Sequence, residues 1–212
     1  MNKSQLDNFI TKYTLGGEIK STKWTSNGNS LSTRFISGDK SVVGNVVLSK
    51  FNHLSPCELG VYNTGQLSSL LSVLGDDVEV SLSQSGDKFI SMEFEDTNRK
   101  TKSKYMLSDL SVIPTPPALK NLPDTFELGI KVDAYFINTF ISGKGALAEA
   151  ETFTILTENN ETKIVIGYAS IASNRVTIPV ETTKYQDIEP ISFNANMFAS
   201  ILNANKDCES AT

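Results

Sequence analysis

Residues 62–71 read Tyr-Asn-Thr-Gly-Gln-Leu-Ser-Ser-Leu-Leu, and residues 193–202 read Phe-Asn-Ala-Asn-Met-Phe-Ala-Ser-Ile-Leu. Each stretch has an aromatic residue, an asparagine that can cap a helix, and apolar residues at matching positions. Asp76 recurs as Asp207 at the same offset of 131 positions. This period is the length of a domain and not of a solenoid unit. The sequence therefore predicts two copies of one domain.

The patterns around the first copy alternate between helix and strand. Ser4 is a candidate N-cap for a helix to Tyr13, whose apolar residues recur at helical spacing, and Gly16-Gly17 ends it. The Asn63 copy of the repeat predicts a second helix over about 64–74. Alternating apolar residues between turn signals predict antiparallel strands at 18–25, 30–36, 41–48, 78–84, 88–96 and 102–107.

The second half begins the same pattern again. Asp133 can cap a helix running to about Ser142. Strands are expected at 152–157, 163–169 and 175–182, followed by the helix that Asn194 caps. Residues 79–110 have no counterpart, so we expect the second domain to lack its final strands. The alternative is that this domain is simply shorter.

A proline-rich segment separates the halves. Residues 113–124 hold four of the seven prolines and can neither continue a helix nor pair as a central strand. We therefore expect an N-terminal domain at 1–112, a connector at 113–124 and a C-terminal domain at 125–212. The fold class predicted is α+β, with two repeats of helix, strands, helix and strands.

Composition excludes several classes of protein. The 212 residues are 39% hydrophobic and 20% charged, which is ordinary for a globular protein. No apolar run approaches the roughly 18 residues of a membrane span, and the N-terminus has no signal-peptide core. With just Cys57 and Cys208, a reducing cytoplasm is expected. A net charge of −5 argues against a simple nucleic-acid binder unless the cations gather on one surface.

The sequence offers little for catalysis, so we expect no enzyme, no metal and no cofactor. His53 is the single histidine and lies in a polar loop, and no CxxC or HExxH motif occurs. Residues 143–148 match G-x-G-x-x-A, but the expected order of strand and helix around them is reversed. The pairs Glu93/Glu95 and Glu149/Glu151 are expected to be solvated carboxylates on strands.

The expected helices have few acids, whereas small polar residues and lysines lie on or beside them. Ser68, Ser69 and Ser72 lie opposite the leucines of the second helix. Lysines lie in or next to the first and third helices, while acids concentrate in strands and loops. A helix face of this kind can lie against phosphates. Solvated lysines with no partner are an equally good explanation for any one position.

This pattern resembles the DNA sliding clamps, most closely the polymerase processivity factors of T-even-type bacteriophages. The resemblance lies in the element order of the whole chain and in three stretches of residues: 31–34 with their hairpin, 60–80, and 194–198. It implies a homotrimeric ring with helices inside and antiparallel sheets outside. It also implies a clamp-loader ATPase and a DNA polymerase as partners, in the cytoplasm of an infected bacterium.

The resemblance also implies roles for individual residues. Six lysines would face the double-stranded DNA without reading its sequence: Lys3, Lys12, Lys20, Lys23, Lys131 and Lys144. Four connector residues would border the groove for a partner peptide: Ile113, Pro114, Leu119 and Leu122. Ring closure would pair the strand near 102–107 with the strand at 175–182 of the next subunit.

Three other functions are alternatives to a clamp. One is a β-rich phage structural or adaptor protein that assembles through strand edges without a DNA role. A single-stranded DNA binder would need exposed aromatic residues among cations, and Trp24 beside Lys23 is one such pair. A hydrolase or transferase is disfavoured by the missing catalytic groups.

Overall fold

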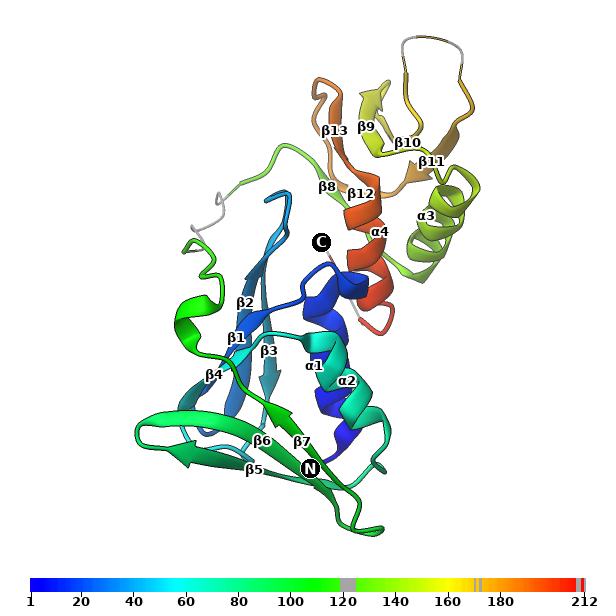
Figure 1. The fold of residues 1–212 in the computed structure, drawn as a ribbon. Helices are drawn as coiled ribbons and strands as arrows, with labels where there is room; N and C mark the ends of the chain where they lie inside the picture. Colours follow the sequence, from blue (N-terminus) through cyan, green and yellow to red (C-terminus); the bar gives the residue numbers. More distant parts are fainter. Residues whose placement is uncertain (119–124, 170, 172, 209–210, 212) are drawn as a thin grey trace. The chain divides into compact units, whose positions relative to one another are not determined.

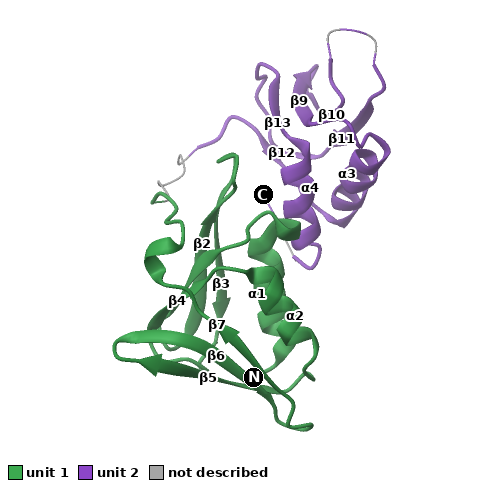
Figure 2. Cartoon of the chain, in the orientation of Figure 1, with its two compact units in different colours: residues 1–119 green, residues 120–212 purple. Residues whose placement is uncertain are grey.

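The computed structural model describes residues 1–118, 125–169, 171, 173–208 and 211. Its described part is an α+β protein with four α-helices and several antiparallel sheets, in agreement with the predicted fold class at this coarse level. The chain divides into two compact units, Met1–Leu119 (unit 1) and Lys120–Thr212 (unit 2), which Figure 2 colours separately. The division falls within residues 113–124, where the sequence predicts a connector.

Unit 1 places two helices beside two antiparallel sheets (Figure 1). The first sheet has the strand order β3-β2-β1-β4 and the second has the order β5-β6-β7. The elements are α1 (Lys3–Thr14), η1 (Leu15–Gly17), β1 (Thr22–Ser26), β2 (Ser30–Ile36), β3 (Val43–Ser49), β4 (Cys57–Val61), α2 (Thr64–Ser72), β5 (Val78–Ser85), β6 (Lys88–Asp96), β7 (Lys102–Met106) and η2 (Leu110–Val112).

The N-cap of the first helix lies two residues earlier than predicted. It is Asn2 and not Ser4, because the Asn2 side chain accepts a hydrogen bond from the Ser4 amide at 2.9 Å. The helix ends where Leu15 and Gly16 adopt positive φ angles of 47° and 73°. Asparagine is among the best N-cap residues, so the capping rule still applies, two positions before Ser4.

One face of the α1/α2 pair is buried against the first sheet. Phe9 and Tyr13 of α1 meet the Trp24 ring of β1 edge-on, with ring centroids 5.4 and 6.3 Å apart. Leu67 and Leu71 of α2 are fully buried as well. Because Trp24 points toward the helices, its strand neighbours Lys23 and Thr25 point to the other side of the sheet.

Unit 2 repeats this arrangement with a sheet of order β11-β10-β9-β13. The strand order is the same in both four-stranded sheets when the strands of each sheet are numbered along the chain: the third strand lies at one edge, then the second, the first and the fourth. The short strands β8 and β12 do not belong to the four-stranded sheet of unit 2. These two form a separate two-stranded sheet, β12-β8. The elements are β8 (Gly129–Ile130), α3 (Ala134–Ala146), β9 (Thr152–Glu158), β10 (Glu161–Ile166), β11 (Val176–Val180), β12 (Thr182–Lys184), β13 (Ile191–Asn194) and α4 (Ala195–Ala204).

Equivalent backbone contacts orient the helices in each unit. The Thr64 amide donates to the Lys20 carbonyl, and 131 positions later the Ala195 amide donates to the Glu151 carbonyl. Bridges Asn2–Asp77 and Val132–Ala211 join the start of each first helix to the chain after the second. The two helices of each unit therefore run antiparallel, and the sequence repeat is also a repeat of tertiary structure.

Unit 1 covers its second helix with strands that come after it in the chain. The Tyr105 hydroxyl on β7 accepts a hydrogen bond from the Asn63 amide, at the start of α2. In the described part of unit 2, no strand comes after α4. Phe193 on β13 stacks on Phe153 and is 46% exposed, and its counterpart Tyr62 in unit 1 is 57% exposed, so the difference in coverage concerns the second helix and not this aromatic position.

Three strands were absent from the sequence prediction: β4, β8 and β13. Each is five residues or shorter, and the residues of β13 are all exposed, so no alternating burial pattern marks it. The single strand expected at 175–182 is divided between β11 and β12. The helix predicted to end at about Ser142 continues to Ala146.

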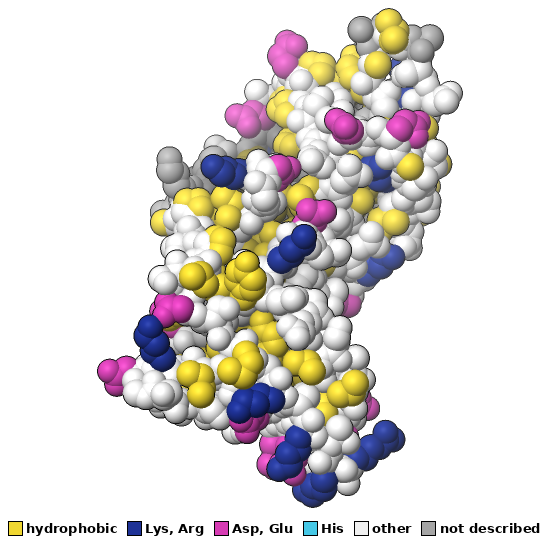
Figure 3. All heavy atoms as spheres, viewed as in Figure 1, with side chains coloured by type: hydrophobic (Ala, Val, Ile, Leu, Met, Phe, Trp, Pro, Cys, Tyr) yellow, Lys and Arg dark blue, Asp and Glu magenta, His cyan; other side chains and the backbone are white. Residues whose placement is uncertain are grey.

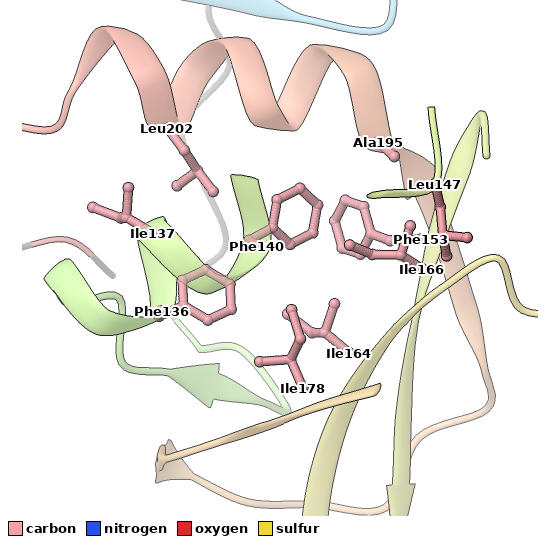
Figure 4. Packing of buried hydrophobic residues seen from close by; sticks show 10 residues of the cluster. All are labelled: Phe136, Ile137, Phe140, Leu147, Phe153, Ile164, Ile166, Ile178, Ala195 and Leu202. Atoms are coloured by element: carbon pink, nitrogen blue, oxygen red, sulfur yellow. The ribbon is translucent and has the colours of Figure 1, made fainter. Parts of the chain in front are cut away.

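Phe140 occupies the centre of the unit 2 core (Figure 4). Its ring is fully buried and lies 4.9 Å from the ring of Phe198 and 5.1 Å from that of Phe153. We predict that Phe140→Ala lowers the free energy of unfolding by about 3–5 kcal/mol, because it leaves a cavity. Denaturant titration followed by circular dichroism measures the loss. Tyr135→Ala, on the same helix but 76% exposed, should change stability little.

The buried carboxylate of Asp96 should make the stability of unit 1 sensitive to acid. Asp96 accepts hydrogen bonds from the amides of Arg99, Gly75 and Asn98, which hold its pKa below the ordinary 3.8. Its stabilising contribution is therefore complete above the ordinary pKa and is lost as pH falls through the folded-state pKa. We predict that Asp96→Asn is less stable at pH 7 and loses less further stability toward pH 3. An unchanged acid profile by thermal melting would contradict this.

Candidate nucleic-acid interface

The four helices are almost free of acidic residues. The chain has 24 Asp and Glu residues, and among those that the structure describes, Asp7 alone lies within an α-helix. The outward positions mainly carry serine, threonine, asparagine and glutamine, which can donate hydrogen bonds to phosphate oxygens, and Tyr135 of α3 is an aromatic exception. Because the apolar stripe of each helix faces its sheet, these polar positions form the solvent surface of the helix pair.

Three of the predicted lysines lie at the helix pair of unit 1. Lys3 starts α1 and pairs with Asp7 at 2.9 Å, and its side chain is just 14% exposed. Lys12 lies in the last turn of α1, where a cation is favourable beside the helix C-terminus. Lys20 is exposed, and its carbonyl accepts a hydrogen bond from the first residue of α2. Lys12 and Lys20 thus mark one end of the antiparallel pair.

Lys23 lies on the other side of the sheet. It follows the β1 alternation away from Trp24, and its ammonium donates to the Thr115 hydroxyl at 2.9 Å. The structure therefore does not bring Lys23 together with Lys12 and Lys20. The direction of Lys23 could have been predicted from the sequence, because neighbouring residues on a strand face opposite sides and Trp24 is apolar.

In unit 2, both lysines expected to face DNA interact with other groups of the protein. Lys131 precedes α3 and pairs with Glu181 at 3.0 Å, which raises the pKa of its ammonium. Lys144 is buried, and its ammonium donates to the carbonyls of Leu147 and Ala148 at 3.4 and 2.8 Å. Lys144 closes the C-terminus of α3 and does not face solvent, contrary to the orientation expected from the sequence.

Gly143 explains why the end of α3 is so closely packed. A Cβ at this position would lie 3.0 Å from Val176 Cγ1 and 3.3 Å from Ile166 Cδ1. The helix therefore approaches β10 and β11 closely and carries Lys144 inward with it. The G-x-G pattern at 143–145 lies in the last helical turn and does not directly succeed a strand, as the dinucleotide motif would require.

The beginning of the predicted connector is held against unit 1. Ile113 is buried and lies beside Gly60 of β4, while Pro114 is exposed. The Arg34 guanidinium donates to the carbonyls of Pro116 and Pro117, which adds a second anchor next to that of Lys23. Sequence reasoning did not find the role of Arg34. Leu119 and Leu122 lie outside the described residues.

Acids and lysines alternate on the outer face of the β5-β6-β7 sheet. Glu93 pairs with Lys104 and Glu95 with Lys102, each at 2.9 Å, and both carboxyl pKa values are lowered by these hydrogen bonds. On the face drawn in Figure 3, lysine and arginine side chains are dispersed, most of them beside an acid. The candidate phosphate-binding surface is thus a low-acid helix face with few cations and not a dense basic patch.

The described residues assemble no group of three or more His, Cys, Asp or Glu side chains that could hold a metal ion. His53 is an exposed loop residue whose ring lies edge-on to Phe51 at 5.2 Å. No helix in the described ranges has the length and apolar character to cross a membrane. Comparison with protein-family models and with curated proteins gave no match.

We predict that Lys144→Met lowers the free energy of unfolding by about 1.5–3 kcal/mol, because the helix-end carbonyls lose a charged donor while the aliphatic volume is kept. Chemical denaturation measures the effect. Lys131→Met, which removes an exposed ion pair, should leave the midpoint nearly unchanged. Equal effects of the two substitutions would contradict a capping role for Lys144.

Proposed function

We propose that this protein is a sliding clamp that encircles duplex DNA and holds a replicative DNA polymerase on its template. The observation that supports the proposal most is the segregation of charge, with Asp7 as the single acid within the helices of the described chain. A surface of this kind lets a polyanion approach the helices, while acids elsewhere repel it from the rest of the protein.

The low number of lysines suits sliding better than tight binding. Lys12 and Lys20 provide diffuse phosphate contacts, and the neighbouring serine and asparagine side chains add weak hydrogen bonds. Contacts to base edges would hold a protein at one sequence, whereas phosphate contacts are equivalent at every step. Affinity would come from topological linkage, which raises the local concentration of the polymerase at the primer end.

Ring closure in this proposal joins identical subunits head to tail into a trimer. The strands β7 and β11 each lie at the edge of their sheet and are the expected partners. Pairing two such edges extends a sheet from one subunit into the next, and removes exposed strand edges. A clamp-loader ATPase that opens the ring, and a polymerase peptide that docks near Ile113 and Pro114, complete the proposed set of partners.

The second candidate is a phage structural or adaptor protein that assembles through strand edges. It is favoured by β13, whose Ile191 and Phe193 are 45% and 46% exposed on an edge strand. An exposed apolar strand edge is a template for pairing with another chain. This function predicts assembly without any effect of the helix lysines.

We predict that Lys12→Gln combined with Lys20→Gln weakens binding to a linear duplex by about tenfold at low salt. The slope of log affinity against log salt should fall in magnitude by roughly 2, since two phosphate contacts are lost. Fluorescence polarisation with a labelled duplex measures both quantities. The matched control, Lys102→Gln with Lys104→Gln, removes two lysines from the outer face of β7 and should change neither.

Primer extension by the cognate polymerase on a long circular template tests the function itself. Product length should increase when the protein and its loader are added, and the Lys12/Lys20 variant should reduce the increase. Sedimentation of the protein alone should detect trimers. Unchanged product length would contradict the clamp proposal. Assembly of the protein with no increase in product length would favour the structural or adaptor function.

A further inference from the structure

A groove on unit 1 lies between β4, the β5–β6 hairpin and the segment that leads from β7 into η2. We call it the hairpin groove, and it has a volume of about 440 Å³. Its lining comes from Glu58 and Gly60, residues 87–90, and residues 107–110. All of these belong to unit 1, so the groove needs no residue from unit 2.

The hairpin groove borders the side of the first sheet that faces away from the helices. Leu59 pairs with Trp24, and both are buried on the side covered by α1. Glu58 and Gly60 alternate with Leu59 and therefore face the opposite side. A ligand in the groove would leave the outer face of α1 and α2 uncovered.

The floor of the groove is apolar. Phe89, Ile90, Leu107 and Leu110 line it, and Ile90 is 38% exposed. The Leu107 amide donates to the Ile90 carbonyl at 2.9 Å, which fixes the two walls relative to each other. Exposed apolar residues lie on the same segment, at Met106 and Val112. Apolar side chains that gather at the surface in this way mark interaction sites.

The rim of the groove carries uncompensated negative charge. Its one lysine, Lys88, is held by the Asp109 carboxylate at 2.5 Å, which also accepts hydrogen bonds from Ser111. Among the described residues, the Glu58 and Asp87 carboxylates have no ion pair and no hydrogen bond. An apolar floor between free carboxylates suits a ligand that combines aliphatic groups with positive charge, and it repels nucleic acid.

We propose that the hairpin groove binds an extended peptide segment of a partner protein, in which aliphatic side chains are flanked by lysine or arginine. The aliphatic side chains would fill the space over Phe89, Ile90 and Leu110, and the cations would meet Glu58 and Asp87. Such a ligand gains both apolar burial and electrostatic steering. The inference goes beyond the proposed function and does not depend on DNA binding, because the groove and the helix face are on different sides of unit 1.

Fluorescence polarisation with the full chain tests this directly. The probe is a fluorescein-labelled peptide, Gly-Arg-Leu-Ser-Leu-Arg-Gly, compared with versions in which glutamate replaces arginine or serine replaces leucine. The parent peptide should bind at least about tenfold more tightly than either version, and its affinity should fall with added salt. Glu58→Gln with Asp87→Asn, and separately Leu110→Ser, should each weaken binding by about fivefold or more.

The matched control, Glu18→Gln with Glu79→Gln, removes two exposed acids outside the groove and should leave peptide affinity unchanged. Addition of a DNA duplex should not displace the peptide, and the Lys12/Lys20 variant should bind it normally, whether or not the protein is a clamp. Absent binding, or equal binding of the glutamate peptide, would overturn the proposal. So would groove substitutions that change the sedimentation of the protein alone, because the groove would then be an interface between copies.

Discussion

In both units an antiparallel helix pair is buried on one face of a four-stranded sheet, and this packing fixes which surfaces remain for binding. In unit 1 the Trp24 ring lies against Phe9 and Tyr13, and in unit 2 Phe153 lies against Phe140 and Phe198. Aromatic side chains bury large apolar areas and prefer edge-on or offset-stacked contacts. Such contacts hold α1, α3 and α4 against their sheets, and buried leucines hold α2. The polar side is then necessarily the outer surface of each unit.

This commitment separates charge as well as polarity. Apart from Asp7, the acids that the structure describes lie in strands, loops and helix caps, and cross-strand lysines such as Lys102 and Lys104 compensate some of them. Exposed ion pairs of this kind add little stability, but they limit the field outside the sheet. The helix surfaces keep a few lysines and many neutral hydrogen-bonding groups. A duplex bound there would be held weakly and without preference for sequence, as the proposed function requires.

The two units differ mainly in the chain beyond their second helix. In unit 1 the chain continues into β5-β6-β7, covers α2, and returns past β4 through Leu107–Leu110. That return path forms one wall of the hairpin groove. In the described part of unit 2, the edge strand β13 keeps Ile191 and Phe193 at the surface. One repeated core thus presents a lined groove in the first unit and an uncovered strand edge in the second.

The repeat, the helices and most strands can be predicted from the sequence, because they depend on local periodicity and capping. Asn63, Asp133 and Asn194 were identified as caps from their positions alone, and each accepts the expected hydrogen bond. Which side chains reach solvent depends instead on how the elements pack. Lys144 turns inward because Gly143 brings α3 onto the sheet, and Lys23 points away from the helices because Trp24 points toward them. The hairpin groove could not be predicted from the sequence, because its walls lie far apart in the chain. They meet through long-range strand pairing, which local patterns do not encode.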